Sequence, residues 1–289
     1  MKYVREKVLK AIDGIGKKQK IFHDTYKSAK KAYLFSRELA IKCRSSKHEY
    51  PVNIFHASIQ RTGSQWIRNV FSDNRVSKYT GLRTFPQHEY EIHEHRLRFP
   101  KYTFVPGLYI PYEAYVRIKK FTPFRTFYII RDPREIICSW VKSMKHSHRP
   151  INPSVNYYRN KLTSKSLKES LLWGIKVISI KLQYMKDWVL NAEEDPNVSV
   201  FRFENLVEKP VDTFLSIFRH CKIEIPRDSL KSILTDYSKK KMREKHNRTR
   251  QTVNKRYVTE RNSWRDVFDE HHKEIFSKVN GKLVQILGY

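Results

Sequence analysis

Residues 124–140 read FRTFYIIRDPREIICSW and contain the clearest structural pattern in the chain. The run TFYII (126–130) is apolar and rich in β-forming residues, as in a buried strand, and RDPR follows it directly. Beyond the proline, apolar residues recur along one face of a predicted helix. They are Ile136, Ile137, Trp140, Val141 and Met144. The stretch therefore predicts a strand, a tight turn and a helix, with Arg131 at the end of the strand.

Two further strands are predicted around this unit. VNIFHA (52–57) leads into IQRTGSQW (59–66) and a short helix that ends near Phe71. VSVFRF (198–203) has the same strand character. Strands that alternate with helices predict an α/β fold, a single domain with a parallel sheet of about five strands flanked by helices on both faces. Other helices are predicted at 166–190, 210–221 and 269–287.

Length and composition favour one domain with an appendage. The 289 residues are 39% hydrophobic and 13% aromatic, which suits one substantial core and argues against disorder. The domain is predicted to span residues 51–289, because the strand pattern begins just after Pro51. Residues 1–50 are predicted to be a basic helical N-terminal extension, with apolar residues such as Val4 and Val8 at helical spacing.

Positive charge is the outlying property of the chain. Lysine and arginine total 58 against 29 acidic residues, a net charge of +29. Such a field attracts anionic partners, such as nucleotides, nucleic acid, anionic lipid or acidic glycans, although a solvated basic surface is the plain alternative. No helix-turn-helix, zinc finger or RNP-like strand is recognisable, so nucleic acid is not the expected partner. The N-terminal helices could lie on an anionic membrane surface or a glycan, or pack on the domain.

The cysteines and apolar runs favour a cytoplasmic protein. Cys43, Cys138 and Cys221 lie far apart without metal-like spacing, and so sparse and odd a set favours a reducing compartment. No apolar run approaches the ~20 residues of a membrane span, and the N-terminus lacks a signal-peptide core. We expect a cytoplasmic location, peripheral to a membrane if the N-terminal helices bind one.

The loop after the first strand is a candidate anion site. In QRTGSQW (60–66), Arg61 supplies a permanent cation, Thr62 and Ser64 supply hydroxyls, and Gly63 lets the backbone approach a phosphate closely. The N–H groups and dipole of the following helix also attract negative charge. The GxxxxGK[ST] spacing of ATPases is absent, and taken alone the loop could be a plain strand-to-helix turn.

Arg131 and Ser139 are candidates for a second anion site. Arg131 stands at a strand end, and Ser139 lies eight residues later on the following helix, so one geometry can aim both at a phosphate. The guanidinium offers a bidentate, charge-assisted contact and the hydroxyl adds a hydrogen bond.

Together these segments resemble the family of sulfotransferases that use 3′-phosphoadenosine-5′-phosphosulfate (PAPS). Residues 60–66 match the family's 5′-phosphosulfate loop, P-K-S-G-T-T-W, and residues 131–140 match its 3′-phosphate segment, R-[ND]-P-[KR]-[DE]-x-x-x-S-[WY]. FRFENLVEKP (201–210) is similar to Y-E-D-L-x-x-x-P, and NSWRDVF (262–268) to the stretch after the R-K-G loop. The four blocks follow the family's order over about residues 52–287, and the chain looks like a divergent, bacterial-type member.

The resemblance implies a P-loop-like sulfotransferase fold, PAPS as co-substrate, 3′-phosphoadenosine-5′-phosphate (PAP) as product, and no metal. It places Trp66 beside the adenine, with a plain core position at the start of its helix as the alternative, and Phe203 stands where a tyrosine is usual. The residues it implies for nucleotide binding are Arg61, Thr62, Gly63, Ser64, Gln65, Trp66, Arg131, Ser139, Phe203, Lys255 and Arg256.

Two departures from the family pattern affect the charged residues. Arg61 replaces the loop lysine; it can stabilise charge on the leaving phosphate but, with a pKa above ~12, it does not donate a proton. The R-K-G triplet is not intact, since YVTERNSW stands where RKGxxGDW is expected. The resemblance therefore assigns the 3′-phosphate cations to Lys255 and Arg256, with Arg261 as another candidate.

An acceptor hydroxyl needs a general base within hydrogen-bond reach. Many cytosolic members place a histidine two residues before a proline, and here Tyr109 holds that place before Pro111. Neutral tyrosine is a poor base near pH 7, so Tyr109 would orient the acceptor instead. Glycan-sulfating relatives use a glutamate after the phosphate loop, where this chain has PQHEYEIHEHR (86–96). We predict Glu89 as the base, with His88 second and a charged surface helix as the alternative.

Charge also guides the choice of acceptor. Positive charge beyond the need of a nucleotide favours an acidic glycan or polysaccharide, as in bacterial-type exopolysaccharide or glycolipid assembly. A small phenol, alcohol or lipid is the alternative, and the aromatic residues of 99–128 could line its pocket. Transfer to a hydroxyl or amine would be an in-line displacement like phosphoryl transfer. Outside enzymes, the rival is a basic nucleic-acid- or membrane-binding protein with a degenerate fold.

Overall fold

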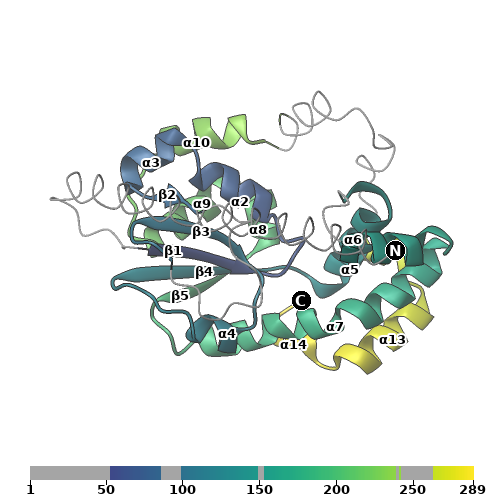
Figure 1. Ribbon diagram of the computed structural model, residues 1–289. Coiled ribbons are helices and arrows are strands. Elements are labelled where there is room, and N and C mark those ends of the chain that lie inside the picture. Colours follow the sequence, from purple (N-terminus) through teal and green to yellow (C-terminus); the bar gives the residue numbers. More distant parts are fainter. Residues whose placement is uncertain (1–52, 86–98, 149–152, 239–240, 242–262) are drawn as a thin grey trace, which may run out of the picture. The chain divides into compact units, whose positions relative to one another are not determined.

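A five-stranded parallel sheet forms the centre of the protein (Figure 1). The computed structural model describes residues 53–85, 99–148, 153–238, 241 and 263–289, and every element below belongs to the compact unit of residues 50–99 and 103–289. In spatial order the strands are β2 (Arg83–Thr84), β3 (Thr103–Leu108), β1 (Asn53–Ser58), β4 (Phe124–Ile130) and β5 (Val198–Arg202). All four neighbouring pairs are parallel, so the predicted α/β class and strand number are confirmed.

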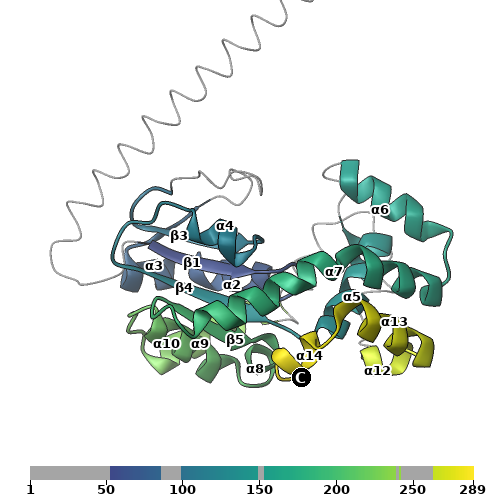
Figure 2. The same cartoon turned by 90° about the horizontal axis from the view of Figure 1, so that it is seen from below.

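Helices cover both faces of this sheet (Figures 1 and 2). One face carries α2 (Ser64–Phe71), α3 (Asn74–Thr80), α9 (Pro210–His220) and α10 (Arg227–Asp236), and the other carries α4 (Tyr112–Val116) and α7 (Leu167–Ala192). After β4 come α5 (Pro133–Lys142), a π-helical turn (Ser143–Ser147) and α6 (Pro153–Thr163). The remaining helices are α8 (Phe203–Glu208), α12 (Trp264–Val267), α13 (Glu270–Asn280) and α14 (Leu283–Ile286).

Strand β4 shows why the core has two layers. Phe127 faces α2, where its ring stacks on that of Phe71 at a centroid distance of 5.4 Å. The next residue, Tyr128, faces the opposite way and stacks on Trp188 of α7 at 4.6 Å. Because both faces of the strand are buried, its sequence is a continuous apolar run rather than an alternation.

Strand β3 was not predicted, because its sequence TFVPGL contains two residues that are rare inside strands. Pro106 has no N–H, and the pairing of β3 with β1 shifts register between Phe55 and Ala57. At this irregularity the N–H of Gly107 donates to Nδ1 of the buried His56 at 3.2 Å. A side chain thus replaces the strand contact that the irregular pairing lacks.

The prediction of one continuous helix at 269–287 is wrong in one respect. The segment forms two helices, α13 and α14, because Gly281 ends α13 with a φ of 55°. Residues 1–50 lie outside the described residues, so the basic extension and the domain boundary stay predictions. No described helix combines the length and the low polarity that a bilayer span requires.

Candidate functional site

The loop between β1 and α2 has an unusual backbone. Arg61 has a φ of 75° and Gly63 a φ of 82°, so two of three consecutive residues adopt the left-handed conformation. At the non-glycine Arg61 this costs on the order of 1 kcal/mol, and such residues concentrate at functional sites. Gly63 is the N-cap of α2. The first N–H groups of the helix have no partner within the helix, and they are suited to bind an anion.

The two loop hydroxyls stabilise the turn. The Thr62 side chain is fully buried and donates to the carbonyl of Ile59 at 2.8 Å. Ser64 Oγ lies 3.1 Å from Ser58 Oγ. Both hydroxyls thus make hydrogen bonds within the protein, and their part in nucleotide binding stays a prediction.

The packing of Phe203 against the loop explains why the loop needs a glycine at position 63. A Cβ at Gly63 would lie 2.9 Å from Cε2 of Phe203, closer than side chains tolerate. The same ring lies under the Arg131 guanidinium, 4.6 Å from its centre, a cation–π contact. Phe203, the first residue of α8, therefore packs against both the loop and Arg131. The structure brings these three predicted residues together.

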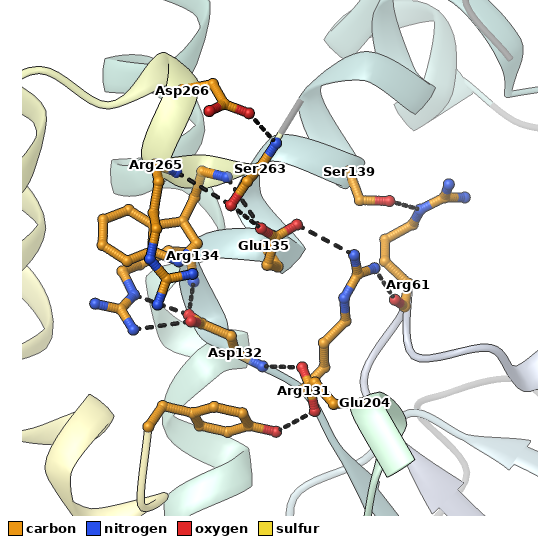
Figure 3. Close-up of polar contacts among 12 residues, drawn as sticks. Arg61, Arg131, Asp132, Arg134, Glu135, Ser139, Glu204, Ser263, Arg265 and Asp266 are labelled. Atoms are coloured by element: carbon orange, nitrogen blue, oxygen red, sulfur yellow. Dashed lines mark hydrogen bonds and ion pairs between the residues drawn. The ribbon is translucent and has the colours of Figure 1, made fainter. Parts of the chain in front are cut away.

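Arg61, Arg131 and Ser139 form one hydrogen-bonded group (Figure 3). The Nε–H of Arg61 donates to Ser139 Oγ at 3.0 Å, and the Arg131 Nη1–H donates to the Arg61 carbonyl at 2.8 Å. The two motifs lie at the carboxyl ends of the adjacent strands β1 and β4. In parallel α/β sheets, ligands bind at this edge.

Two arginines so close raise the positive potential of the site. Arg61 is exposed as a residue, but other atoms surround its guanidinium closely. This desolvation, followed by the charge of Arg131, lowers the pKa of Arg61 to about 10, and the electrostatic effect of Tyr109 opposes the shift. A group with this pKa stays charged at neutral pH. Tyr109 directly follows β3 and is half-buried. It is therefore near enough to Arg61 to interact with it electrostatically.

Trp66 and Gln65 lie on the first turn of α2. The Trp66 ring meets Phe214 of α9 edge-to-face at 5.4 Å, so part of its surface belongs to the core. Its buried indole nitrogen has no hydrogen-bond partner among the described residues. The exposed Gln65 donates its amide N–H to Asn69 Oδ1 at 3.2 Å, within the same helix.

The motif after β4 contains charged residues that the sequence did not single out. Asp132 caps α5, accepting from the N–H of Arg134 at 2.9 Å, and also binds the Arg134 guanidinium through both carboxylate oxygens. The N–H of Asp132 donates to Glu204 of α8 at 3.2 Å. Glu135 contacts Arg131, Ser263 and the N–H of Trp264. The fixed acidic position of the family pattern was the signal that could have identified Glu135.

Five predicted residues lie outside the described part of the chain. They are His88, Glu89, Lys255, Arg256 and Arg261. Their roles as base and as 3′-phosphate cations stay predictions. Among the described residues, no group of histidine, cysteine, aspartate and glutamate side chains could hold a metal ion.

Comparison with known families identifies the domain. Residues 51–288 match the family model of the sulfotransferase domain. The chain belongs to the sulfotransferase family. The prediction of a sulfotransferase is thereby confirmed, and the matched region includes both the loop at Arg61 and the motif at Arg131. A comparison with curated proteins gives no significant match for this sulfotransferase.

The chain is also similar to solved structures, all at low sequence identity. Mouse sulfotransferase SULT7A1 complexed with PAP is 15% identical, with a TM-score of 0.55 over 81% of this chain and 86% of that one. The sulfotransferase domain of the Synechococcus PCC 7002 olefin synthase is 11% identical, with a TM-score of 0.48 over 84% and 97%. Retinol dehydratase in complex with androsterone and inactive cofactor PAP is 13% identical, with a TM-score of 0.47 over 81% of each chain.

Proposed function

We propose that this sulfotransferase moves the sulfuryl group of PAPS to a hydroxyl or amine of an acceptor. The acceptor oxygen or nitrogen forms a bond to sulfur as the bond between sulfur and the bridging phosphate oxygen breaks. PAP leaves with that electron pair, and the acceptor's proton passes to a base. The group of Arg61, Arg131 and Ser139 is the observation that carries the proposal, because it places two cations and a hydroxyl at one sheet edge.

The described residues fit a nucleotide with two separate phosphate groups. The loop offers the N-terminus of α2 and the Arg61 guanidinium to the 5′-phosphosulfate. We assign Arg131 and Ser139 to the 3′-phosphate, following the match of residues 131–140 to the family segment. The indole N–H of Trp66, which finds no acceptor within the described ranges, is a donor that a nucleotide could satisfy.

Arg61 would serve the chemical step. Charge grows on the bridging oxygen as the bond to sulfur breaks, and a preorganised cation stabilises it. The left-handed backbone of Arg61 and the hydrogen bond from its Nε–H to Ser139 fix the position of this cation. Its pKa of about 10 keeps it protonated at neutral pH, so we assign it electrostatic stabilisation.

For the base we retain Glu89, with His88 second. Tyr109 would orient the acceptor, because it follows β3 at the carboxyl edge of the sheet and interacts electrostatically with Arg61. A phenol O–H both donates and accepts hydrogen bonds, which suits a role in orienting the acceptor.

We propose an acidic glycan or polysaccharide as the acceptor. The net charge of +29 far exceeds what one nucleotide needs, and a strongly basic surface steers polyanions to a site. A small phenol, alcohol or lipid is the alternative. We also infer a cytoplasmic location, since the two described cysteines, Cys138 and Cys221, are both buried free thiols. Peripheral binding of residues 1–50 to an anionic membrane stays a prediction.

Calorimetric titration with PAP and with adenosine 5′-monophosphate (AMP) tests the nucleotide site. The proposal expects saturable binding of PAP that is at least about tenfold tighter than that of AMP, because one charge-assisted phosphate contact contributes about 1.5–3 kcal/mol. A nucleic-acid-binding protein or an inactive scaffold would not discriminate in this way. Equal affinities for the two nucleotides would contradict the assignment of the 3′-phosphate site.

A further inference from the structure

Glu135 connects two parts of the chain that are far apart in sequence (Figure 3). Its Oε2 lies 3.4 Å from an Arg131 guanidinium nitrogen. Its Oε1 accepts from Ser263 Oγ and from the N–H of Trp264, both at 3.0 Å. One carboxylate therefore contacts the candidate 3′-phosphate arginine on one side and the start of α12 on the other.

The place of Glu135 in its helix makes this double contact notable. Glu135 is the third residue of α5, where a glutamate commonly accepts from the N–H of the N-cap residue. Glu169 does so in the first turn of α7, closing a capping box with Ser166. In α5 the N–H of the N-cap Asp132 donates instead to Glu204. Glu204 thus takes over the capping contact, and the Glu135 carboxylate can reach other partners.

A second contact fastens α12 to the same turn of α5. The Arg134 guanidinium lies over the Trp264 ring at 3.8 Å and is held there by both oxygens of Asp132. Trp264 is largely buried. The negative charge of Glu135 also suits the N-terminus of α12, where the N–H groups have no helical partner. Ser263 and Trp264 are therefore held at two points next to Arg131.

We propose that Glu135 is a positioning residue for nucleotide binding. It orients the Arg131 guanidinium and holds Ser263 and Trp264 against α5, and so adjusts recognition of the 3′-phosphate without touching the nucleotide. This inference rests on the assignment of Arg131 to the 3′-phosphate under the proposed function. The side chains of Arg131 and Glu135 are 16% and 24% exposed, so solvent screens their ion pair only in part.

Charge and position make opposite predictions for the loss of this carboxylate. Removing a negative charge beside an anion site would by charge alone tighten the binding of PAP. Loss of the two hydrogen bonds from Ser263 and Trp264, and of the contact with Arg131, would weaken it. A weaker affinity for PAP in Glu135→Ala therefore reports positioning and cannot arise from the field of the carboxylate.

The test is calorimetric titration of the full chain with PAP and with AMP. Glu135→Ala should bind PAP about tenfold more weakly, with AMP affinity changed by less than about threefold. Glu169→Ala, which removes a glutamate from the same helix position of α7, is the matched control and should bind both nucleotides as wild type does. PAP affinity that is unchanged, tightened, or lost in step with AMP would overturn the proposal.

Ser263→Ala provides a second variant if Glu135→Ala does not fold. It removes the hydroxyl that donates to Glu135, and it should also weaken the binding of PAP more than the binding of AMP. Where Glu135→Ala does fold, adding Ser263→Ala to it should have little further effect on PAP affinity, because the acceptor that Ser263 shares with Trp264 is already gone. Additive losses would overturn the proposal. If instead wild type itself fails to prefer PAP over AMP, the proposed function fails, which separates the two results.

Discussion

The Nε–H of Arg61 donates to Ser139 Oγ at 3.0 Å, although 78 residues separate the two in sequence (Figure 3). Arg131 closes the group by donating to the Arg61 carbonyl at 2.8 Å. The loop after β1 and the motif after β4 therefore form a single site rather than two independent ones. Substitutions in either segment are expected to affect both ends of the nucleotide, but to different degrees.

Replacing Arg61 tests its part in the chemical step. Arg61→Ala should lower turnover at saturating PAPS by roughly 10²–10³, the usual effect of losing one preorganised charge donor. Arg61→Lys should remain active, because it keeps a cation in the loop. Single-turnover measurements check both. An alanine variant with wild-type turnover would exclude Arg61 from the mechanism.

Replacing Arg131 or Ser139 tests the 3′-phosphate contact. Arg131→Ala and Ser139→Ala should each weaken PAPS binding by about 1.5–3 kcal/mol through the lost charge-assisted contact. Adenosine 5′-phosphosulfate, which lacks the 3′-phosphate, is the control ligand in the same calorimetric titration. If both variants lose as much affinity for the control as for PAPS, these residues do not read the 3′-phosphate.

Gly63 offers a test of the loop's close packing. Gly63→Ala should abolish most nucleotide binding, because the added methyl would meet the Phe203 ring at 2.9 Å and shift the loop or Arg131. Gly81→Ala is the matched control: Gly81 also has a positive φ, of 63°, but its Cβ would meet nothing within 4 Å. Gly81→Ala should lose about 1 kcal/mol of stability from the left-handed backbone, and Gly63→Ala should lose more because of the contact with Phe203.

Only Gly63→Ala should lose affinity for PAP in a titration of the two folded variants. Equal and small effects of the two substitutions on PAP binding would show that the packing of Phe203 on the loop does not matter to the site.

The base is tested by three substitutions. Glu89→Gln should nearly abolish transfer while PAPS affinity and melting temperature stay near wild type, and His88→Ala and Tyr109→Phe should be milder. A carboxylate base also implies that the rate rises with pH through an acidic or near-neutral pKa and then levels. Single-turnover transfer is the measurement. A nearly active Glu89→Gln beside an inactive His88→Ala would assign the role to the histidine.

If Tyr109→Phe is inactive and the other two variants are active, Tyr109 is indispensable for placing or deprotonating the acceptor. Its position at the end of β3, within electrostatic reach of Arg61, makes this outcome physically reasonable. It would contradict the assignment of Glu89.

His56 should make stability depend on pH. Burial lowers the pKa of His56 from 6.5 to about 3, so the folded protein keeps this imidazole neutral, with Nδ1 accepting from Gly107. Below pH 6.5 the unfolded chain binds a proton that the folded chain does not. The contribution of His56 to the free energy of unfolding should therefore fall by about 1.4 kcal/mol for each unit that the pH drops from 6.5 towards 3.

Denaturant titrations at pH 7.5, 5.5 and 4.5, about one unit above and about one and two units below the unfolded pKa of 6.5, measure this effect. His56→Asn keeps an acceptor for the Gly107 N–H but does not titrate, so its stability should fall less steeply with acid. Parallel curves for the two proteins would mean that His56 is not the group responsible.

The sequence allowed the fold to be predicted where strands are uninterrupted. TFYII and VNIFHA predict β4 and β1 because both faces of these strands are buried, which makes the runs continuous. Strand β3 could not be predicted, since Pro106 and Gly107 interrupt it and a side chain, His56, completes its contacts. Such compensation comes from a residue distant in sequence and leaves no local pattern.

The candidate site divides in the same way. Arg61, Arg131 and Ser139 could be predicted because they lie in contiguous motifs next to strand ends. The contact of Phe203 with Gly63 and the link from Glu135 to Ser263 could not, because each joins segments that only the folded sheet brings together.

The central claim is that this chain transfers a sulfuryl group from PAPS. The most direct measurement is transfer from ³⁵S-labelled PAPS to parallel pools of acidic oligosaccharides, neutral oligosaccharides and phenols, with the release of PAP followed in the same reaction. The account predicts label in the acidic oligosaccharides, one PAP released for each sulfuryl group transferred, and loss of transfer in Arg61→Ala. Label in the phenols alone would replace the proposed acceptor. No transfer to any pool by a protein that binds PAP no better than AMP would contradict the claim itself.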